Sequence, residues 1–276
     1  MSEPSEPPVP PSPLPPAYAP APPSGPPPGT ATVRISDWFN QAWALIKPYW
    51  LEYVLAILLA HLVIFVSELL CFLPILLVIG PMMGGIFIYL AKRIVGVPAQ
   101  VPDIFKGFQR FKDTTILGLA LFLVPLIFTA ILFTPTVLGA LGAGSGGRMG
   151  QAFANVTGCL GCMTVPLSII VLLVYPVLAG TYLVFALPLV MFKQMDAITA
   201  IKRSIEIVKP QTANFLMLLL ANMVLLLAAN FVGGVLLCVG ALILSPLAVS
   251  IVGTMQLLAF GDFVGLTRED LAPYAD

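Results

Sequence analysis

Two ionisable residues, His61 and Glu68, lie seven positions apart inside a long apolar run. In a helix this spacing puts both side chains on one face, two turns apart. Ionisable groups inside a membrane are costly, so they usually pair with each other or face water. The pair could therefore form a proton or cation relay. In the interpretation that we favour, a neutral His61 bonds to a neighbouring helix and Glu68 reaches the outer interface.

Two amides, Asn222 and Asn230, lie eight residues apart in another apolar run and share a helical face. Amides in membrane helices most often hydrogen-bond across helices, with a modest gain in stability. They could also bind a polar substrate. We expect the interhelical bond.

Cys159 and Cys162 form the one Cys-x-x-Cys motif of the chain. With Cys71 and Cys238 on the same outer side, the arrangement is similar to that of membrane thiol oxidases, which pass electrons from protein thiols to a quinone. The alternative is that the cysteines are small packing residues or form one structural disulfide. A second Cys-x-x-Cys for zinc is missing, so we expect no metal site and no cofactor.

The composition places these residues in a membrane protein. Apolar residues make up 59% of the 276 residues and charged residues only 9%, against about 25% charged in soluble domains. A surface this apolar is stable only against lipid. The 13 basic and 13 acidic residues cancel, which argues against nucleic acid as a partner. A single histidine and the lack of a catalytic constellation favour a protein that is not an enzyme.

The apolar runs predict an all-α membrane protein with six transmembrane helices. Runs 49–91 and 213–261 each fit two spans, while 114–134 and 163–192 fit one each. We expect residues 137–160 to form a Gly/Ser-rich outer loop. This division puts twelve Lys and Arg on one side and Arg148 alone on the other. Because cytoplasmic loops retain basic residues, both termini are predicted to be cytoplasmic, in the cell (inner) membrane.

Three predicted parts follow along the chain. Residues 1–32 form a disordered, proline-rich cytoplasmic tail, since residues 1–30 hold 14 of the 27 prolines. Residues 33–262 form the six-helix transmembrane domain, and 263–276 a short cytoplasmic C-terminal tail. The N-terminus has neither the basic nor the apolar region of a signal peptide, so we expect membrane entry through an internal span.

The six spans read as three repeats of an amphipathic helix plus a helical hairpin. The second span of each unit carries a proline and a small residue four positions later. Proline bends a helix, and the small residue lets another backbone approach closely. We expect these pairs to pack kinked helices together, the alternative being that they line a cavity or act as hinges. The pairs are Pro81 with Gly85, Pro176 with Gly180, and Pro246 with Ser250.

Three motifs carry a resemblance to a known family. They are Phe39-x-x-Ala42-Trp43-x-x-x-Lys47-Pro48, Gly80-Pro81-x-x-Gly84 and Asp103-Ile104-Phe105-Lys106-Gly107-Phe108. Over residues 34–262 the chain resembles a broad, little-characterised bacterial multi-pass membrane family. That family includes the membrane domain of some glycerophosphoryl diester phosphodiesterases. The resemblance implies the helical membrane fold and no catalytic residues.

Three functions are compatible with these patterns. The first is a non-enzymatic protein that organises the membrane or anchors a partner, with the lipid bilayer and a cytoplasmic protein bound by the proline-rich tail as partners. Pro15-Pro16-Ala17-Tyr18 in that tail fits the PPxY pattern of WW-domain ligands. The second is a small transporter or channel whose kinked helices line a cavity. The third is an outer-facing thiol redox protein that uses Cys159 and Cys162.

Overall fold

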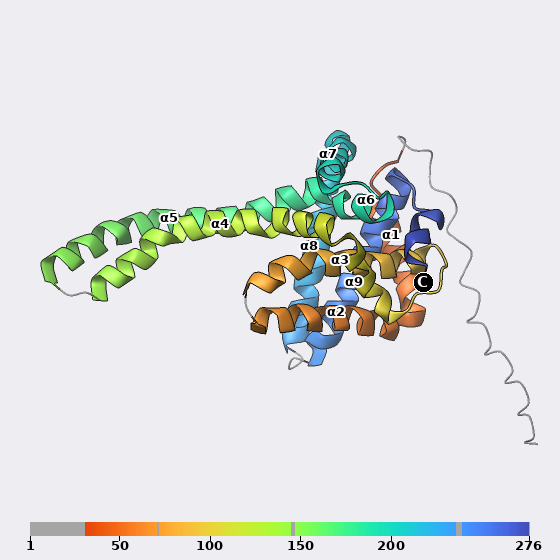
Figure 1. Ribbon diagram of the computed structural model, residues 1–276, viewed down its shortest axis with the longest axis horizontal. Helices are drawn as coiled ribbons and strands as arrows, with labels where there is room; N and C mark the ends of the chain where they lie inside the picture. The colour runs from red at the N-terminus through yellow and green to blue at the C-terminus, as the bar shows by residue number, and fades with distance from the viewer. Residues whose placement is uncertain (1–30, 71, 145–146, 236–238, 276) are drawn as a thin grey trace, which may run out of the picture.

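In the computed structural model of the chain, most of the described residues are helical (Figure 1). It describes residues 31–70, 72–144, 147–235 and 239–275. The predicted proline-rich tail, apart from its last two residues, lies outside the described residues. Six of the described segments are long and apolar enough to cross a membrane, as predicted: Ile35–Ser67, Ile75–Ile94, Val101–Leu141, Ile169–Phe192, Ala197–Val235 and Leu242–Phe263.

The long helices follow one another as three pairs, each preceded by short helices. The first group is α1 (Ile35–Ile46), η1 (Lys47–Tyr49), α2 (Trp50–Leu70) and α3 (Phe72–Ile94). The second is η2 (Val101–Arg110), α4 (Phe111–Gly144), α5 (Gly147–Leu183) and α6 (Ala186–Phe192). The third is α7 (Ala197–Val208), η3 (Lys209–Gln211), α8 (Thr212–Val235), α9 (Val239–Phe263) and η4 (Glu269–Tyr274).

A Lys-Pro pair joins the amphipathic helix to the long helix in the first and third groups. Lys47-Pro48 and Lys209-Pro210 each open a three-residue 3₁₀ turn, η1 and η3. Proline suits the start of such a turn because its missing N–H would have no helical partner there. The equivalent segment of the second group, η2, which was predicted as a short amphipathic helix, is 3₁₀ over its whole length.

The α4–α5 hairpin corrects the prediction of a loop over residues 137–160. Helix α4 continues to Gly144 and α5 begins at Gly147, so most of this Gly-rich segment is helical. Two contacts set the antiparallel register: Tyr175 donates to the carbonyl of Ala120 at 2.6 Å, and Gly139 lies against Thr157 nearer the tip. The small residues stay helical because they let the two helices pack closely.

The hairpin reaches well beyond the neighbouring α2–α3 pair (Figure 1). At 34 residues, α4 is about 51 Å long, whereas a hydrocarbon core is about 30 Å thick. The predicted fourth span over 163–192 is also interrupted, between α5 and α6. Pro188 lacks the N–H that would bond to the carbonyl of Val184, which accounts for a break at that point.

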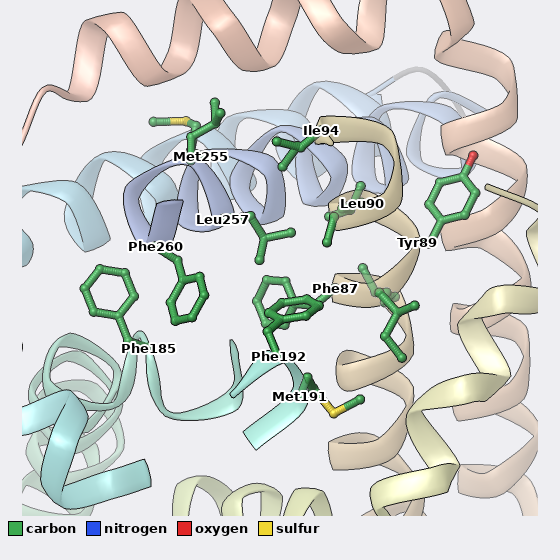
Figure 2. Close-up of a cluster of buried hydrophobic side chains, with 14 of the residues drawn as sticks. Phe87, Tyr89, Leu90, Ile94, Phe185, Met191, Phe192, Met255, Leu257 and Phe260 are labelled. Carbon is green, nitrogen blue, oxygen red and sulfur yellow. The ribbon is translucent and has the colours of Figure 1, made fainter. Parts of the chain in front are cut away.

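The buried apolar core takes residues from most of the helices, and Figure 2 shows a part of it formed by α3, α6 and α9. Phe185 and Phe192, at the two ends of α6, each lie 6.0 Å from Phe260 of α9, measured between ring centroids. Phe87 and Leu90 of α3 complete the cluster. Helix α6 therefore packs against α9 through aromatic rings.

Glycines allow η2 and α4 to lie directly on the backbone of α3. A Cβ on Gly85 would overlap the carbonyl oxygen of Ile104 in η2, and one on Gly107 would overlap that of Pro81. A Cβ on Gly80 would overlap the carbonyl oxygen of Thr114 in α4. No residue larger than glycine fits these three positions without a backbone shift.

The C-terminal segment packs into the fold. Leu271 and Tyr274 of η4 are both buried. The Tyr274 hydroxyl donates to the carbonyl of Met191 at 2.8 Å, and Lys106 donates to the Tyr274 carbonyl at 2.9 Å. The predicted tail at 263–276 is thus, through Ala275, part of the folded domain.

Candidate functional site: the short-helix end and the groove beside α8

Ion pairs gather where the short helices meet the ends of the long ones, a region that we call the short-helix end. Asp103 of η2 accepts from both Lys92 of α3 and Lys106, each at 2.9 Å. The Lys92 and Asp103 side chains are only 3% and 6% exposed. Asp103 also accepts from the backbone N–H of Gln100, which caps η2. This carboxylate therefore ties η2 to α3.

Arg93 lies in a cage of three tyrosines beside the first buried pair. Its guanidinium carbon is 5.3 Å from the ring centroid of Tyr49 and 5.5 Å from those of Tyr53 and Tyr89. Its Nη2 also pairs with Glu52 of α2. Cation–π contacts and an ion pair together stabilise a buried guanidinium, so Arg93 joins α2 to α3.

Further polar contacts fasten the two chain ends to the same region. Arg34 and the Trp38 indole N–H both donate to Asp262 of α9 at 2.9 Å. The hydrogen bond and charge of Asp262 raise the pKa of Arg34. Lys193 donates to both oxygens of Asp270 at 2.9 Å. These contacts tie α1 to α9 and the segment after α6 to η4.

The charged residues of the short-helix end hold neighbouring elements together. Its buried charges are paired across elements, as buried charges must be. Within the described ranges, no three His, Cys, Asp or Glu side chains come together as metal ligands would.

The predicted relay residues, His61 and Glu68, both lie on α2. The ring Nδ1 of His61 lies 2.8 Å from the carbonyl of Ile57 in the same helix, and the side chain is exposed. The contact is thus intrahelical, whereas we had expected a bond to a neighbouring helix. The Glu68 side chain lies outside the described residues.

The two predicted amides behave differently. Asn230 is exposed and donates to the carbonyl of Leu226 at 2.8 Å, within its own helix. Asn222 is 3% exposed, and neither its oxygen nor its nitrogen has a hydrogen-bond partner among the described residues. Among the described residues, neither amide forms the interhelical hydrogen bond that we expected.

Of the predicted redox residues, Cys159 is exposed on α5 and carries a free thiol. The Cys162 side chain, and Cys71 and Cys238 altogether, lie outside the described residues. The redox hypothesis therefore gains no geometry from the structure.

The three proline–small pairs differ in their surroundings. Pro81 and Gly85 lie where the backbone of α3 contacts η2. Gly180 meets only the Leu219 side chain, at 3.4 Å from where a Cβ would stand. The Ser250 hydroxyl donates to the carbonyl of Pro246 at 2.9 Å, within α9.

Two cavities lie among the long helices. The larger, about 820 Å³, is a groove between α1 and α8 that we call the α1–α8 groove. The smaller, about 220 Å³, lies between α3, α4, α5, α6, α8 and α9 and is mostly apolar. Its lining includes Gly80, Phe87, Leu117, Gly180, Leu219 and Gln256. Asn222 is the predicted polar residue that lines the larger groove.

Sequence reasoning missed the Lys92–Asp103 pair and the tyrosine cage. Tyr49, Tyr53 and Tyr89 were read only as parts of apolar runs. Tyr49 and Tyr53 stand four residues apart, on one face of the chain entering α2, and this spacing could have signalled the cage.

No family model, curated protein or solved structure matches this chain. The resemblance to the bacterial membrane family accordingly stays a prediction that rests on the three motifs.

Proposed function

We propose that this protein is a non-enzymatic membrane protein that gathers anionic lipids beneath its short-helix end and anchors a partner there through its proline-rich tail. On this proposal the short-helix end faces the cytoplasmic leaflet of the cell membrane, where anionic lipids attract basic segments.

The observation that carries the proposal is a set of exposed lysines beside exposed apolar side chains. Each short-helix group contributes to the set, and none of these lysines forms an ion pair with the described acidic residues. The lysines are Lys47, Lys112, Lys202 and Lys209. The neighbouring apolar side chains are Phe39, Trp43 and Trp50 near α1, Phe105 and Phe111 near η2, and Ile198 and Ile205 on α7.

Such a combination is typical of helices that lie in a membrane interface. Indole and phenyl rings enter the headgroup layer while lysines meet anionic phosphates, each worth about 1 kcal/mol near the surface. The buried pairs around Lys92 and Arg93 support the proposal because they hold the short helices rigidly. Four lysines on a rigid frame would favour several anionic lipids at once.

Lipid clustering tests the lipid arm of the proposal. Full-length protein is reconstituted into phosphatidylcholine vesicles containing a minor fraction of self-quenching fluorescent phosphatidylglycerol. We expect quenching to rise with protein, and to fall by more than half when the four lysines are replaced by Gln. The matched control replaces the same lysines by Arg and keeps the quenching. Equal quenching by the Gln variant would refute the lipid arm.

A tail deletion tests the anchoring arm. Removing residues 1–32 should abolish capture of a WW-domain probe while leaving membrane insertion and lipid clustering unchanged. The single substitution Tyr18→Ala should have the same effect on capture, because the tyrosine completes the PPxY pattern. If the deletion left capture of the probe unchanged, the proposed anchoring role of the tail would be refuted.

A further inference from the structure

The α1–α8 groove has the size of a ligand site and opens toward lipid. Its volume of about 820 Å³ lies within the range of about 300–1,000 Å³ that is usual for small-molecule sites. Two of its lining side chains, Met217 and Val224, are 63% and 65% exposed on a spanning helix. Met255 of α9, which is buried, lies at the bottom of the groove. A molecule of the bilayer can therefore enter the groove sideways.

Hydrogen-bond donors gather at one end of the groove, which belongs to the short-helix end. Arg34 and Ser36 lie where α1 begins. Asn40 lies further along α1, and Asn214 lies at the start of α8. The side chains of Ser36, Asn40 and Asn214 form no hydrogen bond with another described residue. Arg34 bonds to Asp262 through Nη2, which leaves other donors of its guanidinium for a ligand.

Beyond this polar end, the groove follows α8 for the depth of one leaflet. Asn214 and Ala228, which line its two ends, are about 21 Å apart along the helix axis. One leaflet with its headgroups is about 20–22 Å thick. Ala221 and Ala228 are small and exposed, so a chain can lie against the helix. Asn222 also lines this part, but its amide atoms are buried and offer a ligand no hydrogen bond.

We propose that the α1–α8 groove binds one phospholipid molecule of the leaflet beside the short-helix end. The phosphodiester oxygens accept hydrogen bonds from the donors of the polar end, and an acyl chain lies along α8. Among the described lining residues only Arg34 is charged, and Asp262 neutralises it. The site therefore recognises the phosphodiester rather than the net charge of the headgroup. Such a site goes beyond the lipid gathering proposed above, and it uses none of the four exposed lysines.

Native mass spectrometry counts the lipid bound to full-length, delipidated protein in detergent. We expect one phosphatidylcholine to bind before any other as the lipid is titrated. The variant with four Lys→Gln substitutions should keep this lipid, because the lysines lie outside the groove. In that variant phosphatidylglycerol should bind with a Kd within about threefold of that for phosphatidylcholine, since the groove does not select headgroup charge.

Substitutions in the groove separate this site from general lipid contact. Ala221→Phe fills the apolar part and should weaken phosphatidylcholine binding by about tenfold or more. Ala213→Phe makes the same change at an exposed position outside the groove, and this matched control should bind as the wild type does. Asn40→Leu combined with Asn214→Leu removes two donors and should also cost about tenfold or more. All four positions are exposed, so the melting temperature should stay close to that of the wild type.

Three outcomes would overturn the inference. One is equal binding of phosphatidylcholine by Ala221→Phe and the wild type. Another is loss of the bound lipid in the four-lysine variant, which would place the lipid on the exposed lysines instead. The third is efficient disulfide formation between copies of Met217→Cys in membranes, in a variant whose native cysteines are serine. That result would show that a second copy of the chain fills the groove.

Discussion

Helix α3 and the α4–α5 hairpin are both apolar, yet they are packed in opposite ways. In the most apolar window of the span Ile75–Ile94 in α3, 67% of the residues are buried and the mean hydropathy is 1.9. In that of the span Val101–Leu141, which includes most of α4, only 18% of the residues are buried and the mean hydropathy is 2.8. The more hydrophobic helix is thus the less buried one. In a membrane, high hydropathy marks surface that lipid can cover, whereas glycines and paired charges mark the protein core.

The largest predicted effect breaks the charge cluster at the end of α3. Asp103→Asn leaves Lys92 and Lys106 without their shared counter-charge, which we expect to destabilise the protein by about 3–5 kcal/mol. Thermal unfolding of the protein in detergent measures this. The control, Glu206→Gln, breaks the exposed Arg203–Glu206 pair and should change stability by less than about 1 kcal/mol. Similar losses for both would contradict a core at α3.

Matched leucines compare the two regions directly. Leu90 of α3 is fully buried, whereas Leu141 near the hairpin tip is 68% exposed. Leu90→Ala should cost about 2–5 kcal/mol and Leu141→Ala about 0.5 kcal/mol or less. Thermal unfolding in detergent measures both losses of stability. A Leu141 variant that is as unstable as the Leu90 variant would mean that the hairpin tip is covered by protein.

Matched glycines sharpen the comparison further. Gly85→Ala forces η2 away from α3 and should cost about 1–3 kcal/mol. A Cβ on Gly158 of α5 meets nothing within 4 Å, so Gly158→Ala should stabilise by up to about 1 kcal/mol through helix propensity. Opposite signs for the two variants are the expected result, and a stabilising Gly85→Ala would contradict the close packing of η2.

The smallest effect concerns the capping of α7. Hydrogen bonds from Thr199 hold the pKa of Asp196 below its usual value of 3.8. A depressed pKa means that the cap stabilises the fold above the unfolded value and loses this contribution as pH falls through the folded value. The melting-temperature gap between wild type and Asp196→Ala should therefore close in strong acid. Asp196→Asn, an uncharged cap, should show a much weaker dependence on pH.

Hydropathy was sufficient to predict the six spans, because lipid exposure makes their apolar character visible in the sequence. The division of the run 49–91 into two spans is confirmed by α2 and α3. The helical tip of the α4–α5 hairpin was missed because a Gly- and Ser-rich segment is typical of a loop. Only the packing of α4 against α5 shows that these small residues are helical. The unpaired state of Asn222 could not be predicted either, since it depends on what α1 and α9 place around it. The docking of Tyr274 likewise depends on a distant carbonyl at Met191.

The most direct test of the account is the sidedness of the basic end. Single cysteines replace Lys47, Lys209 or Arg148 in a full-length variant whose native cysteines are serine. A membrane-impermeant thiol reagent is then added to intact cells and, separately, to inverted membrane vesicles. The account predicts labelling at positions 47 and 209 in the inverted vesicles alone, and at position 148 in the intact cells alone. Labelling of all three from one side would contradict it.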